Sequence, residues 1–468
     1  MTCHLNFHKN IIIKLLLVQL KISNNFLTNS CFIQFIFGDE IAMVIKKALH
    51  TLCLLGFSST LSAQQPILIE DSVYYPGKKE GLILSGYIQP QFQFAQQKGV
   101  RTVEGGDFAD GVSNRFMLRR SRVKVEYTLN GLQKNPGMHF AFQFDASERG
   151  FNIKDIWGRI QENNWKLFSL TTGLFVRPFG FEVNYSSSDR ETPERGRMSQ
   201  TLLKGERDLG VMISLDARKQ IRFLDVLKMD AGLFNGPGSG VKSDIDNRKD
   251  FIGRISLKPI QLTNDICLGT SVSALLGGIQ NNTRYVFNTV LQNGTRMQVK
   301  DSSIQNLGSY SPRKYIGADV QIKIKNRIGD IELRAEWVQG IQTATAFSSA
   351  TPEALLTGYD GFYKRNLKGA YFYFLQKIFS LKHQLVIKYD FYDPNTRVSG
   401  KEIGQPGTGF TQADIKYNTL GLGYNYYFSE NIKLMLYYAS VKNESSSLPG
   451  FTKDVRDNVL TTRLQFKF

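Results

Sequence analysis

The feature that most constrains this chain is a repeated alternation of apolar with polar residues over segments of about ten residues. In the last segment one face is apolar or aromatic, with Leu460, Thr462, Leu464, Phe466 and Phe468. The other face is polar or charged, with Thr461, Arg463, Gln465 and Lys467. Successive side chains of a strand point to opposite faces, so the pattern predicts a strand with one apolar and one wet face.

The same alternation recurs upstream, in residues 316–325, 331–337 and 385–391. A soluble β-sandwich also alternates, but charged residues on the second face of so many long strands favour a water-filled interior. After the N-terminal region no apolar run approaches the roughly 18 residues of a membrane helix. With a mean hydropathy of −0.24, the chain is also too polar for a helical membrane bundle.

Short and long connections alternate between the predicted strands. Tight turns are predicted near residues 130–137, 163–164, 219–220, 263–264, 326–329, 380 and 429–430. Long polar loops are predicted near residues 96–114, 178–207, 280–311, 340–362, 394–414 and 443–455. The fold class is therefore all-β: a transmembrane antiparallel β-barrel of about 16 strands, an even number in the range of such barrels.

Aromatic residues support this class, since 12% of the residues are Phe, Trp or Tyr and they gather near strand ends. Examples are residues 371–374 and 424–428, which suit aromatic girdles at the two membrane interfaces better than ordinary cross-strand pairs. The final strand ends on Phe468, a pattern expected to be recognised by the barrel-assembly machinery.

The N-terminus predicts export. From Met43, a positive start with Lys46 and Lys47, an apolar stretch and a small-residue cleavage site at Ala63 form a signal peptide over 43–63. Residues 1–42 are interpreted as a mis-annotated or untranslated extension, with a genuine long leader or anchor as the alternative. Residues 64–80 are expected to be a short periplasmic segment, and residues 81–468 the barrel domain.

The charge balance points to anionic partners. Residues 1–63 hold five Lys/Arg and two Asp/Glu of a chain of net charge +17, so the exported part carries about +14. A basic excess fits nucleic acid, a membrane surface or an anionic solute, and export makes nucleic acid the least favoured. Cys267 is the one cysteine after the cleavage site, which argues against a disulfide framework.

The densest cationic segment is predicted to line an anion path, through Arg115, Arg119, Arg120, Arg122 and Lys124. If Val123, Val125, Tyr127 and Leu129 face lipid, then Arg120, Arg122 and Lys124 project together into the lumen at steps of about 6.6–6.8 Å. Arg119 falls on the lipid face, so either it lies above the hydrocarbon or a bulge resets the register. The alternative is a solvated basic face countered by carboxylates or lipopolysaccharide phosphates.

A long segment rich in both charge signs is predicted to fold inward and narrow the pore. Its predicted constriction residues are Arg177, Arg190, Glu191, Glu194, Arg195, Arg197 and Arg207. Pro178, Gly180 and Pro193 punctuate it. The alternative is an exposed loop whose charges pair with one another.

Catalytic chemistry is not expected, because common nucleophile, zinc and phosphate-loop motifs do not occur. His139 and His383 lie in separate predicted strands, and His139 is interpreted as a polar residue of the lumen. No metal site and no cofactor are expected.

Five stretches together resemble the phosphate-selective porin O and P family, in the branch common among Bacteroidetes. They are residues 86–92, 119–122, 142–145, 173–180 and 206–210. The resemblance covers essentially the whole exported chain and is sharpest over 81–215. It implies a sixteen-stranded barrel, usually trimeric, with an arginine ladder and an inward-folded loop at its constriction. By position, Arg119, Arg120 and Arg122 look like part of that ladder; the chain departs from the pattern in lacking a clear lysine cluster and in carrying Glu191 and Glu194.

The expected function is an outer-membrane porin for passive diffusion of small anions such as phosphate or polyphosphate. Expected partners are outer-membrane lipid, lipopolysaccharide and two further copies of the chain. The alternatives are a weakly selective general or oligosaccharide porin, and a structural or adhesive outer-membrane barrel. An outer-membrane hydrolase that uses His139 is the weakest.

Overall fold

The computed structural model describes residues 80–131, 135–218, 222–240, 244–356 and 360–468. The expected N-terminal extension (1–42), the signal peptide (43–63) and all but the last residue of the segment 64–80 lie outside the described residues. Within these ranges, no helix is long and apolar enough to cross a membrane.

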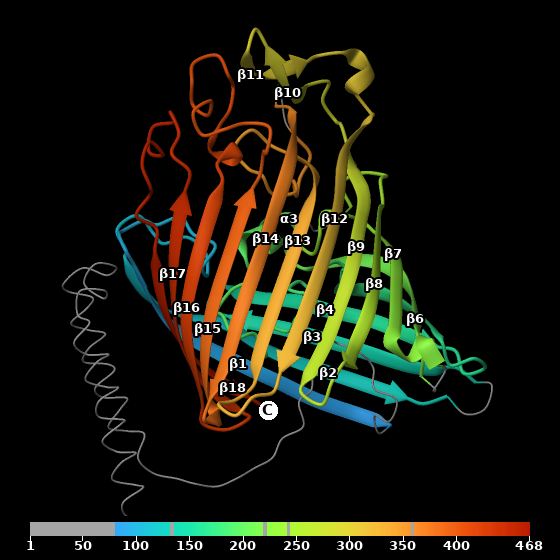
Figure 1. Ribbon diagram of the computed structural model, residues 1–468. Coiled ribbons are helices and arrows are strands. Elements are labelled where there is room, and N and C mark those ends of the chain that lie inside the picture. The colour runs from blue at the N-terminus through green and yellow to red at the C-terminus, as the bar shows by residue number, and fades with distance from the viewer. Residues whose placement is uncertain (1–79, 132–134, 219–221, 241–243, 357–359) are drawn as a thin grey trace, which may run out of the picture. The chain divides into compact units, whose positions relative to one another are not determined.

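Strands dominate the described chain (Figure 1). The first nine are β1 (Gly81–Ala95), β2 (Asn114–Leu129), β3 (Gly137–Ser147), β4 (Gly150–Gln161), β5 (Phe168–Val176), β6 (Arg207–Asp216), β7 (Leu227–Phe234), β8 (Asp250–Gln261) and β9 (Ile266–Gln280). The rest are β10 (Val286–Gln292), β11 (Thr295–Asp301), β12 (Tyr310–Ile324), β13 (Ile331–Ala344), β14 (Phe362–Ile378), β15 (Ser380–Asp393), β16 (Tyr417–Tyr427), β17 (Ile432–Asn443) and β18 (Val459–Lys467). The helical pieces are α3 (Arg197–Leu202), η1 (Arg222–Val226), η2 (Ile304–Asn306) and η3 (Gln412–Asp414).

The sheet closes on itself, because β1 pairs antiparallel with both β2 and β18. Strand β9 pairs directly with β12, while β10 and β11 form a hairpin in the connection between them. This hairpin touches the sheet through a short parallel pairing of β10 with the start of β14. Among the described residues, sixteen strands therefore form the closed antiparallel barrel. The predicted fold class and strand number are confirmed.

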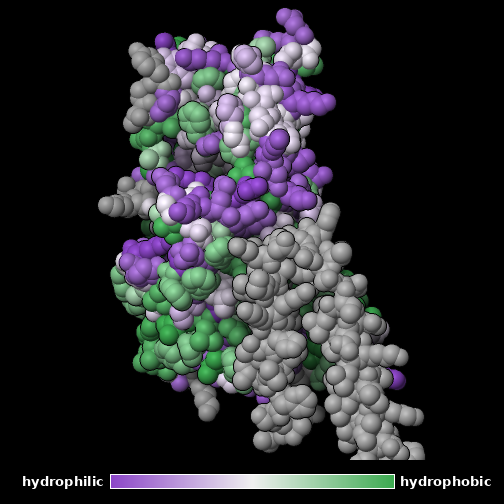
Figure 2. Space-filling view, turned by 90° about the vertical axis from the view of Figure 1, so that its left-hand side faces the viewer, coloured by the Kyte–Doolittle hydropathy of each residue, from purple (hydrophilic) through white to green (hydrophobic). Residues whose placement is uncertain are grey.

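The side chains alternate as predicted. On β18, Thr461, Arg463 and Gln465 are buried inside, while Phe466 on the opposite face is 38% exposed. Figure 2 shows hydrophobic side chains gathered over the lower part of the visible face and hydrophilic ones above them. Such an outward apolar band suits contact with lipid.

A bulge lies where β1 meets β2. Ile88 pairs with Ser121 and Pro90 with Leu118, so Gln89 alone stands opposite both Arg119 and Arg120. Two consecutive residues of β2 thereby face one residue of β1, which resets the alternation of faces. Of the two interpretations left open for Arg119, the bulge is confirmed.

The two ends of the barrel differ. Short connections at one end include residues 262–265 and 325–330, and the long ones at the other end include residues 96–113, 281–309 and 394–416. The C-terminus lies at the short-turn end (Figure 1). One long connection, residues 235–249, was not predicted, and neither was the β10–β11 hairpin.

Candidate functional site

Residues 177–206, which join β5 to β6, lie inside the barrel and are called the inner segment. One side of this segment is apolar: Phe179, Val183, Met198, Leu202 and Leu203 are each at most 3% exposed. They belong to one hydrophobic cluster with inward-facing residues of β5 to β9, β12 to β15 and β17. Part of the barrel interior is therefore a packed core, and the hydrophobic effect holds the inner segment against that wall.

The chain turns inward at Gly180. Its φ of +63° is a conformation that glycine adopts without a steric penalty. The backbone amides of Phe181 and Glu182 then donate hydrogen bonds of 3.0 and 3.1 Å to Oε2 of Glu336 on β13. The amide of Gly180 donates to Oγ of Ser273 on β9 at 3.0 Å. These bonds fix the point at which the inner segment enters the lumen.

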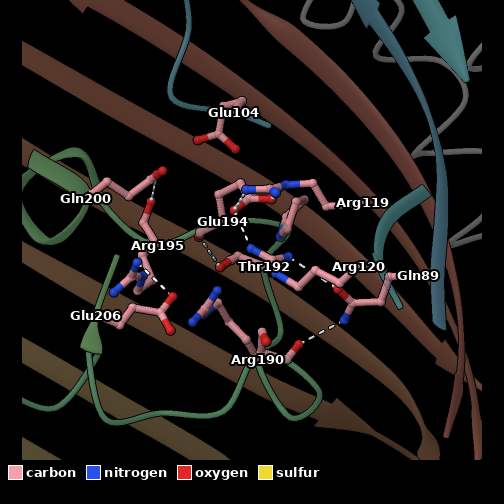
Figure 3. A network of polar contacts seen from close by, with 12 residues as sticks. Gln89, Glu104, Arg119, Arg120, Arg190, Thr192, Glu194, Arg195, Gln200 and Glu206 are labelled. Atoms are coloured by element: carbon pink, nitrogen blue, oxygen red, sulfur yellow. Dashed lines mark hydrogen bonds and ion pairs between the residues drawn. The ribbon is translucent and has the colours of Figure 1, made fainter. Parts of the chain in front are cut away.

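Glu194 is the centre of an arginine cluster (Figure 3). Its carboxylate lies 2.7 Å from Nε of Arg119, 2.7 Å from Nη2 of Arg120 and 3.1 Å from Nη2 of Arg463. Arg119 and Arg120 come from the bulge in β2, and Arg463 comes from β18. The two charged segments are thus in contact, and this contact pairs the strand arginines with a carboxylate.

Two further carboxylates of the inner segment bind cations on the opposite wall. Glu191 accepts hydrogen bonds of 2.8 and 2.9 Å from the guanidinium group of Arg334 on β13. Glu182 lies 3.0 Å from Nζ of Lys388 on β15. The inner segment is thus tied to both sides of the barrel through charge pairs that are almost fully buried.

The remaining strand cations among the predicted site residues also have partners. Arg122 pairs with Asp145 at 3.0 Å, Lys124 with Glu126 at 3.2 Å and Arg207 with Asp155 at 2.8 Å. Arg115, at the start of β2, donates to the carbonyls of Gly106 and Asp107, both at 2.7 Å, and so lies against the β1–β2 connection at the long-loop end.

Three arginines of the inner segment keep buried N–H groups that lack an acceptor among the described residues. These are Nε and Nη1 of Arg190, Nη1 of Arg195 and Nε of Arg197. Arg190 is 3% exposed, and among the described residues its side chain donates one hydrogen bond, to the carbonyl of Tyr185 at 3.2 Å. Arg195 pairs with Glu206 at 2.8 Å, while the guanidinium carbon of Arg197 lies 3.9 Å from the ring centroid of Tyr417. Figure 3 shows Arg190, Arg195 and Glu206 beside the Glu194 cluster.

Glu104, in the β1–β2 connection, approaches the same region (Figure 3). Its side chain is buried, and its Oε2 has no hydrogen-bond partner among the described residues. Burial raises the pKa of this carboxyl to about 7, against an attraction to Lys388. The group therefore changes charge near neutral pH.

Sequence reasoning did not predict several residues of this network as site residues: Glu104, Arg334, Lys388, Arg463, and Lys433, whose ammonium donates to the carbonyls of Ser188 and Arg190. The four strand residues could have been found, because the alternation of their strands places them on the inward face. Charged side chains inside a barrel need partners or water. For Glu104 no such indication existed, because a loop has no periodicity.

Comparison with known proteins identifies the family and the fold of this chain. The family model for phosphate-selective porin O and P matches residues 97–468. The outer membrane channel DcaP of Acinetobacter baumannii is 11% identical, with a TM-score of 0.51, over 84% of this chain and 99% of that one. OmpF of Salmonella typhi, solved with daunomycin, is 12% identical with a TM-score of 0.50, over 85% and 99% of the two chains.

The structural likeness concerns the fold, since the identities are low. No curated protein matches the chain. The family model, by contrast, spans nearly all of the barrel. The chain belongs to the phosphate-selective porin O and P family and is an outer-membrane β-barrel porin.

Proposed function

We propose that this porin lets small anions, phosphate among them, diffuse passively across the outer membrane along the arginines of the inner segment. The family to which the chain belongs supports diffusion of anions. A channel of this kind needs no cofactor and no covalent step.

The observation that carries the proposal is the way charges are distributed around the inner segment. This segment contains five Lys/Arg and five Asp/Glu, so its own charge is balanced. Glu182, Glu191 and Glu194, however, all bind cations of the barrel wall. Arg190 and Arg197 of the segment are left without an ion pair among the described residues, and their positive charge remains available to a solute.

Unpaired guanidinium N–H groups in a confined space favour an anion. A buried donor without an acceptor costs about 1–3 kcal/mol, and more when it is charged. Phosphate oxygens accept two parallel hydrogen bonds from one guanidinium group, which stays charged at every physiological pH. Several such groups in succession would admit an anion and still release it, as conduction requires.

The wall residues have a supporting role in this proposal. Arg119, Arg120 and Arg122, bound to Glu194 and Asp145, would hold the inner segment and add a positive potential. Lys433 adds to it, because its ammonium donates to the carbonyls of Ser188 and Arg190 and not to a carboxylate.

We also propose a route of export and assembly, from the N-terminal and C-terminal sequence features and from the trimer that the family resemblance implies. The chain is exported by the leader 43–63, is assembled by the barrel machinery through its last strand, forms a homotrimer and contacts lipid and lipopolysaccharide. Fold and family are those of a channel, and His139, bound to Glu126 at 3.2 Å, serves in this account as a lumen residue.

The test is block of chloride current by phosphate in planar bilayers. Phosphate is expected to reduce the current of the wild-type porin, and Arg190→Gln is expected to weaken this block. Arg101→Gln is the matched control, because Arg101 lies in an exposed part of the β1–β2 connection. Equal block in wild type and Arg190→Gln would contradict the role of Arg190.

Other outcomes identify the alternatives. A current with no ionic preference and no block would leave a general or oligosaccharide porin. Absence of any current from correctly folded protein would favour a structural or adhesive barrel.

A further inference from the structure

A groove of about 520 Å³ lies on the outer surface of the barrel wall, away from the lumen. It crosses β9, β12, β13 and β14, which lie side by side in the wall that faces the viewer in Figure 1. The outward side chains that line it are Leu276, Lys314, Ile316, Gln339, Ile341 and Lys368.

The strand register places the groove at the upper border of the apolar band. One outward row across the four strands is Val272, Ala318, Trp337 and Ala370. The next row toward the long loops is Ala274, Ile316, Gln339 and Lys368, followed by Leu276, Lys314, Ile341 and Asn366. Apolar side chains thus give way to lysines and amides within the groove. This is the level at which lipid headgroups meet a barrel.

Both lysines are available to a ligand. Lys314 and Lys368 are exposed, and neither forms an ion pair or side-chain hydrogen bond with another described residue. Lys314 lies on β12 and Lys368 on β14, so their backbones are about 9.6 Å apart across the strands. They are also offset by two residues, about 6.6 Å, along the strand direction. Two side chains that each reach several ångströms can therefore meet at one anionic group, while their stems cover the apolar floor.

The surrounding charges leave the groove positive. Asp393 pairs with Lys368 across the sheet and is the nearest outward carboxylate along that row. Its Oδ1 accepts a hydrogen bond of 3.1 Å from the amide of Asn395 and does not form an ion pair with Lys368. Two ammonium groups then face one carboxylate at the rim.

We propose that this groove binds the phosphorylated headgroup of an outer-leaflet lipid, with Lys314 and Lys368 on the phosphate and acyl chains against Leu276, Ile316 and Ile341. The combination of an aliphatic floor with two unpaired ammonium groups favours an amphiphile over a free ion. A second copy of the chain is disfavoured as the occupant, because Lys314 and Lys368 would then meet the lysines of that copy or be buried without a counter-charge. The proposal specifies the lipid contact proposed above and rests on the outer-membrane location, not on anion conduction.

The test is native mass spectrometry of the detergent-purified full chain with bisphosphorylated lipid A. Wild type is expected to retain the lipid, and Lys314→Ala/Lys368→Ala to bind it about tenfold more weakly. Lys442→Ala is the matched control, because Lys442 is an exposed lysine near the same end of β17, outside the groove. The double Lys→Arg variant should bind as wild type does, which separates loss of charge from loss of fold.

Four results would overturn the proposal. The first is equal binding by wild type and the double Ala variant, and the second is equal retention of dephosphorylated lipid A. The third is displacement of lipid A by inorganic phosphate alone, which would make the groove a free-anion site. A change in oligomeric state without a change in lipid binding would assign the groove to a second copy and also overturn it. The double Ala variant is expected to keep wild-type ion selectivity, so failure here is distinguishable from failure of the anion path.

Discussion

Glu194 of the inner segment and Arg120 of β2 form an ion pair of 2.7 Å in which both side chains are at most 5% exposed. The same carboxylate holds Arg119 and Arg463, so one residue of the inner segment gathers three arginines from two neighbouring regions of the wall. This relationship fixes the inner segment and neutralises part of the arginine row at the same time.

Replacing Glu194 by Gln should separate these two effects. Removing one partner of a buried pair leaves uncompensated charge and costs about 3–5 kcal/mol. We expect a lower unfolding temperature together with a stronger preference for anions, because three guanidinium groups lose their counter-charge. Heat-dependent gel mobility and reversal potential measure the two effects. Glu148→Gln is the control, since Glu148 is a half-exposed carboxylate between β3 and β4. Unchanged stability and selectivity would mean that the Glu194 cluster does not hold the segment.

Gly180→Ala should displace the inner segment at its entry point. A methyl group there would meet the Glu336 carboxylate at 2.0 Å, and a φ of +63° costs a residue with a side chain about 1 kcal/mol. The amides of Phe181 and Glu182 would then lose their acceptor. We expect a changed single-channel conductance with a broader distribution. Gly450→Ala is the matched control, because Gly450 also has a positive φ but open space around it. Identical conductance histograms for wild type and Gly180→Ala would contradict this.

The selectivity should depend on pH near neutrality through Glu104. Its pKa of about 7 means that it gains negative charge as the pH rises from 6 to 8. Charged groups near it are Lys388, Glu194, Asp390 and Arg197, so the added charge enters the arginine region. Anion preference should therefore fall over this range, and Glu104→Gln should abolish the fall. A pH-independent reversal potential in wild type would exclude the group from the path.

The same residue has a consequence for stability. Because the pKa in the folded state is raised above the ordinary value of 4.5, the folded protein holds this proton more tightly. The stabilisation that this bound proton gives to the folded state is fully present below a pH of about 4.5 and is lost as the pH rises to about 7. Unfolding temperatures of wild type and Glu104→Gln should diverge across this interval, with the variant the more stable above pH 7. Unfolding temperatures of the two proteins that differ by the same amount at every pH would argue against a raised pKa of Glu104.

Phe468 should control barrel closure. Its amide and carbonyl exchange hydrogen bonds of 2.9 and 3.0 Å with Gly86 of β1, and its ring packs over that glycine. Deleting Phe468 removes this last pair of the β1–β18 seam. We expect a several-fold smaller folded fraction in outer-membrane preparations, measured by heat-dependent gel mobility. Trp165→Ala, an exposed aromatic residue in a short turn, should leave the fraction unchanged. Normal assembly without Phe468 would show that the seam does not need it.

Much of the barrel could be predicted from the sequence, because a closed sheet between lipid and water imposes a period of two on every strand. The faces of β12, β13 and β18 follow that rule. One residue departs from the rule. By its position Arg119 should face lipid, and the bulge opposite Gln89 explains why it does not.

The site was less predictable. The arginine-rich strand and the charged loop were recognisable, but their pairing through Glu194 depends on long-range contacts that no local pattern encodes. The apolar side of the inner segment was missed for a related reason. Phe179, Met198 and Leu202 follow no strand period, and their apolar side is recognisable only once the inward residues of β12 to β15 and β17 are in place.

The most direct test of the central claim is the reversal potential of the purified porin in planar bilayers under a KCl gradient, for wild type and Arg190→Gln. We expect a chloride-directed reversal potential in wild type and a clearly smaller one in Arg190→Gln. A potential near zero, or one directed toward potassium, would contradict anion diffusion along the inner segment.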